Sequence, residues 1–319
     1  MRIVSLLPSV TEILFAIGAG DDVVGVTHEC DFPPAARGLP VLTSSLLPPE
    51  LQPQSGAAPA KPAGRAGGID RHVRASVHAG SSLYALDDAL LERLAPDLIV
   101  TQELCAVCAV SYEIVAQAAK RMRGDGPAVI SLEPSSLDDV YANIITVGEL
   151  TGSADGAHAL VRGLRQRAAA LAARRPAAPG PTVLVLEWSD PPMSGGHWTP
   201  GLIELAGGTP VLANPGANSQ RITWAAIAAA DPDVIIVAPC GYDLAAAETA
   251  ARELEGLAAW NALRAVRSGR AYAMDGNAYV NRPGPRLLES AEIFAAIVRG
   301  RDLPTHAAAP LNPYYSRCR

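Results

Sequence analysis

Four cysteines stand where they could share one metal site. Cys105 and Cys108 are two residues apart in the stretch TQELCAVCAVS, Cys30 lies in HECD and Cys240 in APCGYD. Each stretch directly follows an apolar run of strand length. Four thiolates complete the first shell of a zinc ion or hold an iron-sulfur cluster. Two other interpretations stay open: Cys30 and Cys240 as small buried apolar residues, and the CxxC as a redox pair before a helix.

These cysteines converge only if the strands before them belong to parallel sheets. Strands are predicted at 2–7, 23–27, 96–100, 127–132, 182–188, 231–240 and 270–274, and those at 23–27 and 96–100 are predicted to be buried. Helices are predicted at 9–18, 87–95, 111–124, 135–152, 154–175, 199–207 and 285–300. Ser9-x-x-Glu12 suits a capping box for the first helix, with Gly18 as its stop. The alternation predicts an α/β fold with mainly parallel sheets.

The pattern runs twice along the chain. Residues 95–100 read APDLIV and residues 231–237 read DPDVIIV, and each copy leads into a loop that carries a cysteine. We therefore predict an N-terminal α/β lobe at 1–152, a bridging helix at 153–176 and a C-terminal α/β lobe at 177–319. Residues 46–70, rich in Pro, Gly and Ala without helical or strand periodicity, are predicted to form a mobile insertion.

Composition and motifs restrict the classes of function that the chain could have. The 319 residues carry a formal net charge of -6, which gives no basic face for nucleic acid or an anionic membrane. The first residues, MRIVSLLPSVTEI, lack a signal-peptide pattern, so we expect a cytoplasmic protein without membrane insertion. No phosphate-binding glycine loop, nucleophile elbow or HExxH is recognisable, which favours a binding protein over an enzyme.

Four stretches carry a resemblance to a known family: residues 2–34, LAPDLIVTQ, SDPPMSGGHWTPGLIELAGG and NRPGPRLLESAEIFAA. They resemble the cobalamin- and siderophore-binding solute receptors of ABC importers. The resemblance covers nearly the whole chain apart from the insertion. It implies two Rossmann-like lobes joined by one rigid helix, with the ligand in a cleft at the carboxyl ends of the strands.

The resemblance also implies which residues meet a corrinoid ligand. The expected contacts are Glu29, Gln102, Trp188, His197, Trp198, Tyr242 and Tyr279. The positions at which family members present acidic residues to the permease are Ala89 and Ala225 here, so docking on a permease is not expected. The leading hypothesis is a cytoplasmic cobalamin-binding protein. The alternatives are a four-cysteine zinc or iron-sulfur protein, perhaps an enzyme, and a periplasmic importer receptor whose start lies upstream of Met1.

Overall fold

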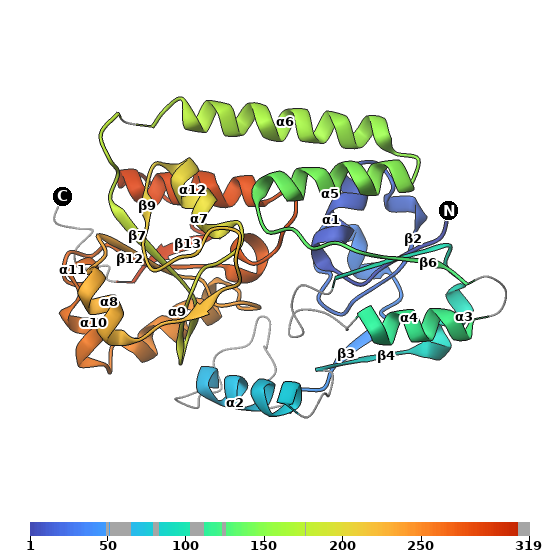
Figure 1. Cartoon of the computed structure of the whole chain (residues 1–319), viewed down its shortest axis with the longest axis horizontal. Helices are drawn as coiled ribbons and strands as arrows, with labels where there is room; N and C mark the ends of the chain where they lie inside the picture. Colours follow the sequence, from blue (N-terminus) through green and yellow to red (C-terminus); the bar gives the residue numbers. More distant parts are fainter. Residues whose placement is uncertain are drawn as a thin grey trace. The chain divides into compact units, whose positions relative to one another are not determined.

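The computed structural model describes residues 1–48, 51, 65–78, 83–102, 112–122, 126–175 and 177–311 (Figure 1). They group into two compact units. The first runs to Leu164 and the second from Arg165 onwards, apart from residues 65–70 and 135–137, which group with the second. The boundary between the units falls inside a single helix, α6 (Ala154–Ala172), where a long helix was predicted.

The first unit is built on a four-stranded parallel sheet of order β2-β1-β5-β6. Its strands are β1 (Ile3–Ser5), β2 (Val23–Val26), β5 (Leu98–Thr101) and β6 (Ala128–Ser131). All residues of β1 and β5 are buried, as expected of central strands covered on both faces. These strands lie where the apolar runs predicted them.

Helices follow the strands of the first unit. They are α1 (Pro8–Ala16), α3 (Asp88–Leu94), α4 (Tyr112–Arg121) and α5 (Leu137–Leu150), with short 3₁₀ turns η1 (Gly20–Asp22) and η2 (Pro34–Gly38). Outside the sheet, β3 (Thr43–Ser45) and β4 (Tyr84–Leu86) form an antiparallel ribbon.

The predicted capping box of α1 is wrong. The helix begins one residue earlier, at Pro8, whose fixed φ and missing N–H suit a first helical position. Leu7 is the N-cap and supplies no side-chain hydrogen bond. Ser9 and Glu12 are therefore buried within the helix. The predicted stop is confirmed: Gly18 takes a φ of +87° just after the helix.

The predicted insertion contains a helix. Residues 46–70 were expected to lack regular structure, but α2 (Arg65–His78) begins inside that range. Ala66 and Ile69, three residues apart, are its buried apolar side chains in this range. Two glycines beside them remove the wider apolar stripe that marks an amphipathic helix in a sequence. Residues 49–50 and 52–64 lie outside the described part of the chain.

The second unit has a seven-stranded sheet. Its path is β10-β8-β7-β11-β12-β13, and β9 also pairs with β7. The strands are β7 (Thr182–Ser189), β8 (Pro192–Ser194), β9 (Thr209–Pro210), β10 (Gln220–Arg221), β11 (Val234–Val237), β12 (Ala271–Met274) and β13 (Ala308–Pro310). The central strands β7, β11 and β12 are parallel as predicted. Strands β8, β10 and β13 extend the sheet with antiparallel pairs, and their two or three residues are too few to show a strand pattern in the sequence.

Seven helical segments of the second unit follow α6 in chain order within the described residues. They are α7 (Thr199–Ala206), α8 (Trp224–Ala230), α9 (Leu244–Leu254), α10 (Ala258–Ala262), α11 (Arg264–Arg267), a π-helical turn η3 (Gly276–Val280) and α12 (Leu287–Arg299), besides the residues that α6 contributes. No helix in the described ranges is long and apolar enough to cross a bilayer.

The repeated PD sequence has the same structure in both units. Helices α3 and α8 end at Ala95 and Asp231, which adopt left-handed backbone conformations with φ of 40° and 35°. A Pro-Asp pair then leads into the buried strands β5 and β11. In each copy the aspartate after the proline joins its strand to the neighbouring one: Asp97 accepts from the Arg2 N–H at 2.7 Å and Asp233 from the Thr182 N–H at 2.9 Å. The predicted internal repeat is thus confirmed at the level of hydrogen bonds.

Candidate functional site

The carboxyl ends of β7, β11 and β12 bring several loops of the second unit together. The Cys240 N–H donates to the Glu187 carbonyl at 3.1 Å, and the Asn277 N–H donates to the Tyr242 carbonyl at 3.0 Å. The loop before α7 is attached by Trp198, whose Nε1–H donates to the Val280 carbonyl at 2.8 Å. Ligands of open α/β sheets bind at such edges. This edge is therefore the candidate site of the second unit.

Two predicted aromatic contacts meet at this edge. The rings of Trp188, at the end of β7, and Tyr242, in the loop after β11, are 5.6 Å apart and meet edge to face at 72°. Tyr242 is buried, whereas Trp188 is only partly buried and holds its indole N–H on the Asp190 carbonyl at 3.0 Å. The pair forms a fixed apolar surface with the Trp188 ring as its accessible member.

His197 and Trp198 stack on each other in the loop before α7. Their ring centroids are 5.4 Å apart and the ring planes differ by 29°. Trp198 is 8% exposed, so it mainly supports the loop. His197 Nε2 lies 3.0 Å from the amide oxygen of Asn218, which can only accept, so Nε2 carries the hydrogen and Nδ1 keeps its lone pair. Desolvation lowers the pKa of His197, which favours this neutral form, a potential ligand for a transition metal.

A buried carboxyl group lies beneath this loop. Glu187 accepts hydrogen bonds from Ser219 Oγ, from Thr199 Oγ1 at 2.9 Å and from the Gly196 N–H. Burial nevertheless outweighs these three donors and raises the pKa of Glu187 from 4.5 to about 7. The sheet edge therefore holds a carboxyl group that is protonated in part of the molecules at neutral pH.

The two glycines before His197, Gly195 and Gly196, allow this loop to pack closely against residues 217–219 and against Glu187. A Cβ on Gly196 would overlap the Ser219 nitrogen and the Ala217 carbonyl, and one on Gly195 would lie 2.6 Å from the Thr199 methyl and 3.1 Å from Glu187 Oε1. The His197 N–H donates to the Ala217 carbonyl at 2.6 Å. Backbone thus packs on backbone here, and this contact positions the His197 ring.

Tyr279, the remaining predicted aromatic contact of this unit, is packed inside it. It is 7% exposed, and the Arg286 guanidinium lies 5.5 Å above its ring. Burial is the main cause that raises its pKa. Nearby, buried Arg282 donates to Asn277 Oδ1 at 3.1 Å, which fixes the segment after β12. Tyr279 therefore shapes the edge from within.

The first unit has its own polar edge after β2. His28 Nδ1 lies 2.7 Å from Thr43 Oγ1, and the His28 N–H donates to the same oxygen at 3.1 Å. Thr43 Oγ1 also lies 2.8 Å from Thr27 Oγ1. The ring of His28 packs beside Tyr84, and desolvation lowers its pKa. Two predicted contacts, partly buried Glu29 and buried Gln102, follow β2 and β5 in this unit.

The cysteines are only partly described. Cys30 is buried, with Sγ 3.0 Å from Thr11 Oγ1, and Cys240 is exposed; neither forms a disulfide within the described ranges. Cys105 and Cys108 lie outside the described residues, as does Cys318. In the part of the chain that is described, no three His, Cys, Asp or Glu side chains group as a metal site. The shared four-cysteine site therefore stays a prediction, without support from the described geometry.

The two predicted docking positions are equivalent in structure. Ala89 and Ala225 are the second residues of α3 and α8, whose N-caps Asp87 and Thr223 accept from the backbone. The first turn of α3 carries Asp88, which already pairs with Arg121 at 2.6 Å. The first turn of α8 has no acidic residue.

Sequence reasoning missed Glu187 and its partners. Thr199 and Ser219 lie 12 and 32 residues away, so no local motif links them. One signal was present: Glu187 interrupts the apolar run TVLVLEW at its carboxyl end. A carboxylate in a buried strand requires partners, and this would have marked the position.

The chain was compared with known proteins. The profile described as periplasmic binding protein matches residues 3–278. The uncharacterized ABC transporter substrate-binding lipoprotein YvrC of Bacillus subtilis is 24% identical over 307 residues, 92% of this chain and 78% of that protein. The vitamin B12-binding protein of Vibrio cholerae is 23% identical over 295 residues, 91% of this chain and 86% of its own length.

A solved structure shares the fold. The periplasmic heme-binding protein from Pseudomonas aeruginosa superposes with a TM-score of 0.67 at 21% identity, and the match covers 97% of both chains. At this identity the similarity shows a common architecture of two α/β parts and leaves the ligand open.

Proposed function

This chain belongs to the periplasmic binding protein family, the solute-binding proteins of ABC importers, and we propose that its ligand is a corrinoid of the cobalamin type. The observation that carries the proposal is the pair of Trp188 and Tyr242 at the sheet edge of the second unit. A corrin macrocycle presents wide apolar faces, which aromatic rings contact well. The relative from Vibrio cholerae, named for vitamin B12 binding, supports the choice.

In this proposal His197 contacts the central metal of the ligand at the same edge. Its neutral ring keeps the Nδ1 lone pair, and imidazole nitrogen is a common ligand of transition metals. Asn218 and the stacked Trp198 orient the ring, which is the usual arrangement around a metal-binding histidine. The macrocycle would lie on Trp188 while His197 reaches toward the cobalt.

The test is a titration of the full chain with cyanocobalamin and, separately, hemin, followed by absorption and tryptophan fluorescence. We expect cobalamin to bind with the higher affinity. Trp188→Leu should weaken cobalamin binding about ten-fold, the value of one lost aromatic contact. The matched control is Trp224→Leu, because Trp224 is also partly buried but packs against Trp260 in the core.

Three outcomes would contradict the proposal. They are no cobalamin binding, tighter binding of hemin than of cobalamin, and equal losses in the Trp188 and Trp224 variants. For His197, the absorption spectrum of bound aquocobalamin should change in His197→Ala, because the imidazole would no longer bind cobalt. An unchanged spectrum would remove His197 from the metal while leaving the aromatic contact intact.

Proteins of this family typically dock on an ABC permease. We propose that this chain docks weakly, because alanines occupy both expected acidic positions. If so, Ala89→Glu with Ala225→Glu should increase retention of the protein by membranes that contain its permease. The predicted cytoplasmic location stays a prediction, and fractionation of cells that express the chromosomal gene would decide it.

A further inference from the structure

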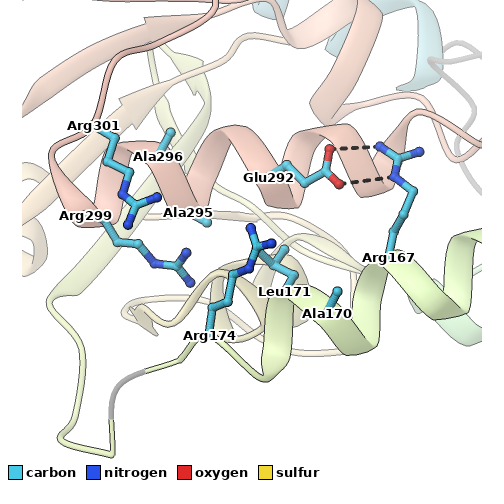
Figure 2. Close-up of a pocket in the computed structure, with 9 residues that line it drawn as sticks. All are labelled: Arg167, Ala170, Leu171, Arg174, Glu292, Ala295, Ala296, Arg299 and Arg301. Carbon is cyan, nitrogen blue, oxygen red and sulfur yellow. Dashed lines mark hydrogen bonds and ion pairs between the residues drawn. The ribbon is translucent and has the colours of Figure 1, made fainter.

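A pocket lies away from the sheet edge, on the helices of the second unit. It lies between the last turns of α6 and the length of α12, and its volume is about 410 Å³ (Figure 2). This size falls within the range of ordinary small-molecule sites. The pocket shares no residue with the aromatic edge, so the two are separate sites.

Charged groups of one sign dominate the pocket. Its lining contains Arg167, Arg174, Arg299 and Arg301 but a single carboxylate, Glu292. Arg167 forms a bidentate ion pair with that carboxylate, with Nε 3.1 Å from Oε1 and Nη2 2.8 Å from Oε2. Within the described residues no ion pair includes the other three arginines. A chain with a net charge of -6 therefore collects three uncompensated cations in one place.

One nitrogen of these guanidinium groups is buried without a partner. Nη2 of Arg299 is shielded from solvent and makes no hydrogen bond to any atom of the described chain. A buried donor of a charged group destabilises the fold when it stays unsatisfied. The nearby carbonyl of Val298 accepts instead from Arg270 Nη2, at 3.0 Å. A bound acceptor would supply the missing partner.

The end of α12 directs two arginines to the same space. Gly300 takes a φ of 61° after the helix, and the Arg301 N–H then donates back to the Ala296 carbonyl at 2.9 Å. Figure 2 shows the side chains of Arg174, Arg299 and Arg301 extending into the space between the helices. Buried Leu171 and Ala295 form an apolar floor, which lowers the local dielectric and strengthens charge-assisted hydrogen bonds.

We propose that this pocket binds a small multivalent oxyanion of phosphate chemistry, such as a pyrophosphate group. Guanidinium groups bind phosphate oxygens through two parallel hydrogen bonds, and three free guanidinium groups match a ligand with several negative charges. A monocarboxylate would neutralise only one of them. The volume also leaves room for a small organic group beside the phosphates, against the apolar floor.

The experiment is isothermal titration of the full chain with inorganic pyrophosphate at low ionic strength, without corrinoid. We expect one site with a dissociation constant below about 1 mM that weakens as salt is added. Arg174→Gln and Arg301→Gln should each weaken binding about ten-fold, the value of one charge-assisted hydrogen bond. Both side chains are exposed, so these variants should remain folded, which circular dichroism checks.

The matched control is Arg267→Gln, which removes an exposed arginine of α11 in the same unit and should leave the affinity unchanged. Citrate and acetate serve as carboxylate probes and should bind more weakly than pyrophosphate. The proposal is overturned by the absence of pyrophosphate binding, by equal losses in the Arg267 and Arg174 variants, or by tighter binding of citrate. None of these results bears on the corrinoid proposal, because cobalamin titration reports the other site.

Discussion

The buried carboxyl group of Glu187 leads to a measurable dependence of stability on pH. Its pKa is about 7 in the folded protein and ordinarily 4.5, so between these values the folded chain holds a proton that the unfolded chain has released. The free energy of unfolding must therefore fall as pH rises through this window. The stabilising contribution is complete below pH 4.5 and lost above pH 7. The pKa difference corresponds to about 3 kcal/mol.

The change that isolates this effect is Glu187→Gln, which keeps the size of the side chain and one oxygen to accept from Thr199. The amide does not titrate, so the loss above neutral pH should disappear. Urea unfolding of both proteins, measured from about pH 4.5 to about pH 8, gives the free energy of unfolding at each pH. The wild-type value minus the variant value should fall by about 3 kcal/mol across this range.

All other titrating groups cancel in this difference, because both proteins contain them. The control is Glu204→Gln, an exposed glutamate of α7 whose carboxylate stays in water in both states. This variant keeps Glu187, so its free energy of unfolding should still fall as pH rises through the window. A Glu187 difference that stays flat within about 0.5 kcal/mol would refute the reasoning, since it would mean that burial does not raise the pKa.

Three further predictions follow from single contacts. Gly196→Ala should destabilise the protein by about 2 kcal/mol or more, because its Cβ would overlap backbone atoms of Ala217 and Ser219. Gly201→Ala has open space around its Cβ and should stabilise α7 by about 0.5–1 kcal/mol. Thermal unfolding of both variants checks this, and equal effects would contradict it. Hydrogen bonds from Thr182 hold the pKa of Asp233 below its ordinary value. Asp233→Asn should therefore lower the free energy of unfolding by about 1 kcal/mol at neutral pH, and by progressively less toward acid pH, where the wild-type carboxylate also loses its charge. A loss that does not change with pH would contradict this. Iodoacetamide should label Cys240 in the native protein well before Cys30, which peptide mass mapping would reveal, and equal labelling rates would show that Cys30 is not buried.

The corrections to the sequence predictions have physical causes. Ser9 and Glu12 have the spacing of a capping box. The prediction failed because Pro8 suits the first helical position, so α1 begins one residue earlier. Helix α2 was missed because its few buried apolar residues leave no continuous stripe. In both cases the residue types were identified correctly. The conformation depended on the neighbouring Pro8 in α1 and on tertiary packing in α2.

Buried apolar runs separated by helices determined the parallel sheets, because a strand covered on both faces must be apolar throughout. The PD repeat was also legible, since a left-handed residue, a proline and an aspartate act within a few positions of one another. Family resemblance followed from the same segments. These features are local, and a sequence records local interactions directly.

Tertiary structure alone decided the two sites. Glu187 acquires its raised pKa from burial under a loop that holds Thr199 and Ser219, and the pocket needs Arg174 beside Arg299 and Arg301 from another helix. Burial and electrostatic coupling depend on distance in space, and residues far apart in the chain come together only when the sheet and its helices pack. A sequence lists the charged groups, but the fold determines which of them lose water and which are left without a partner.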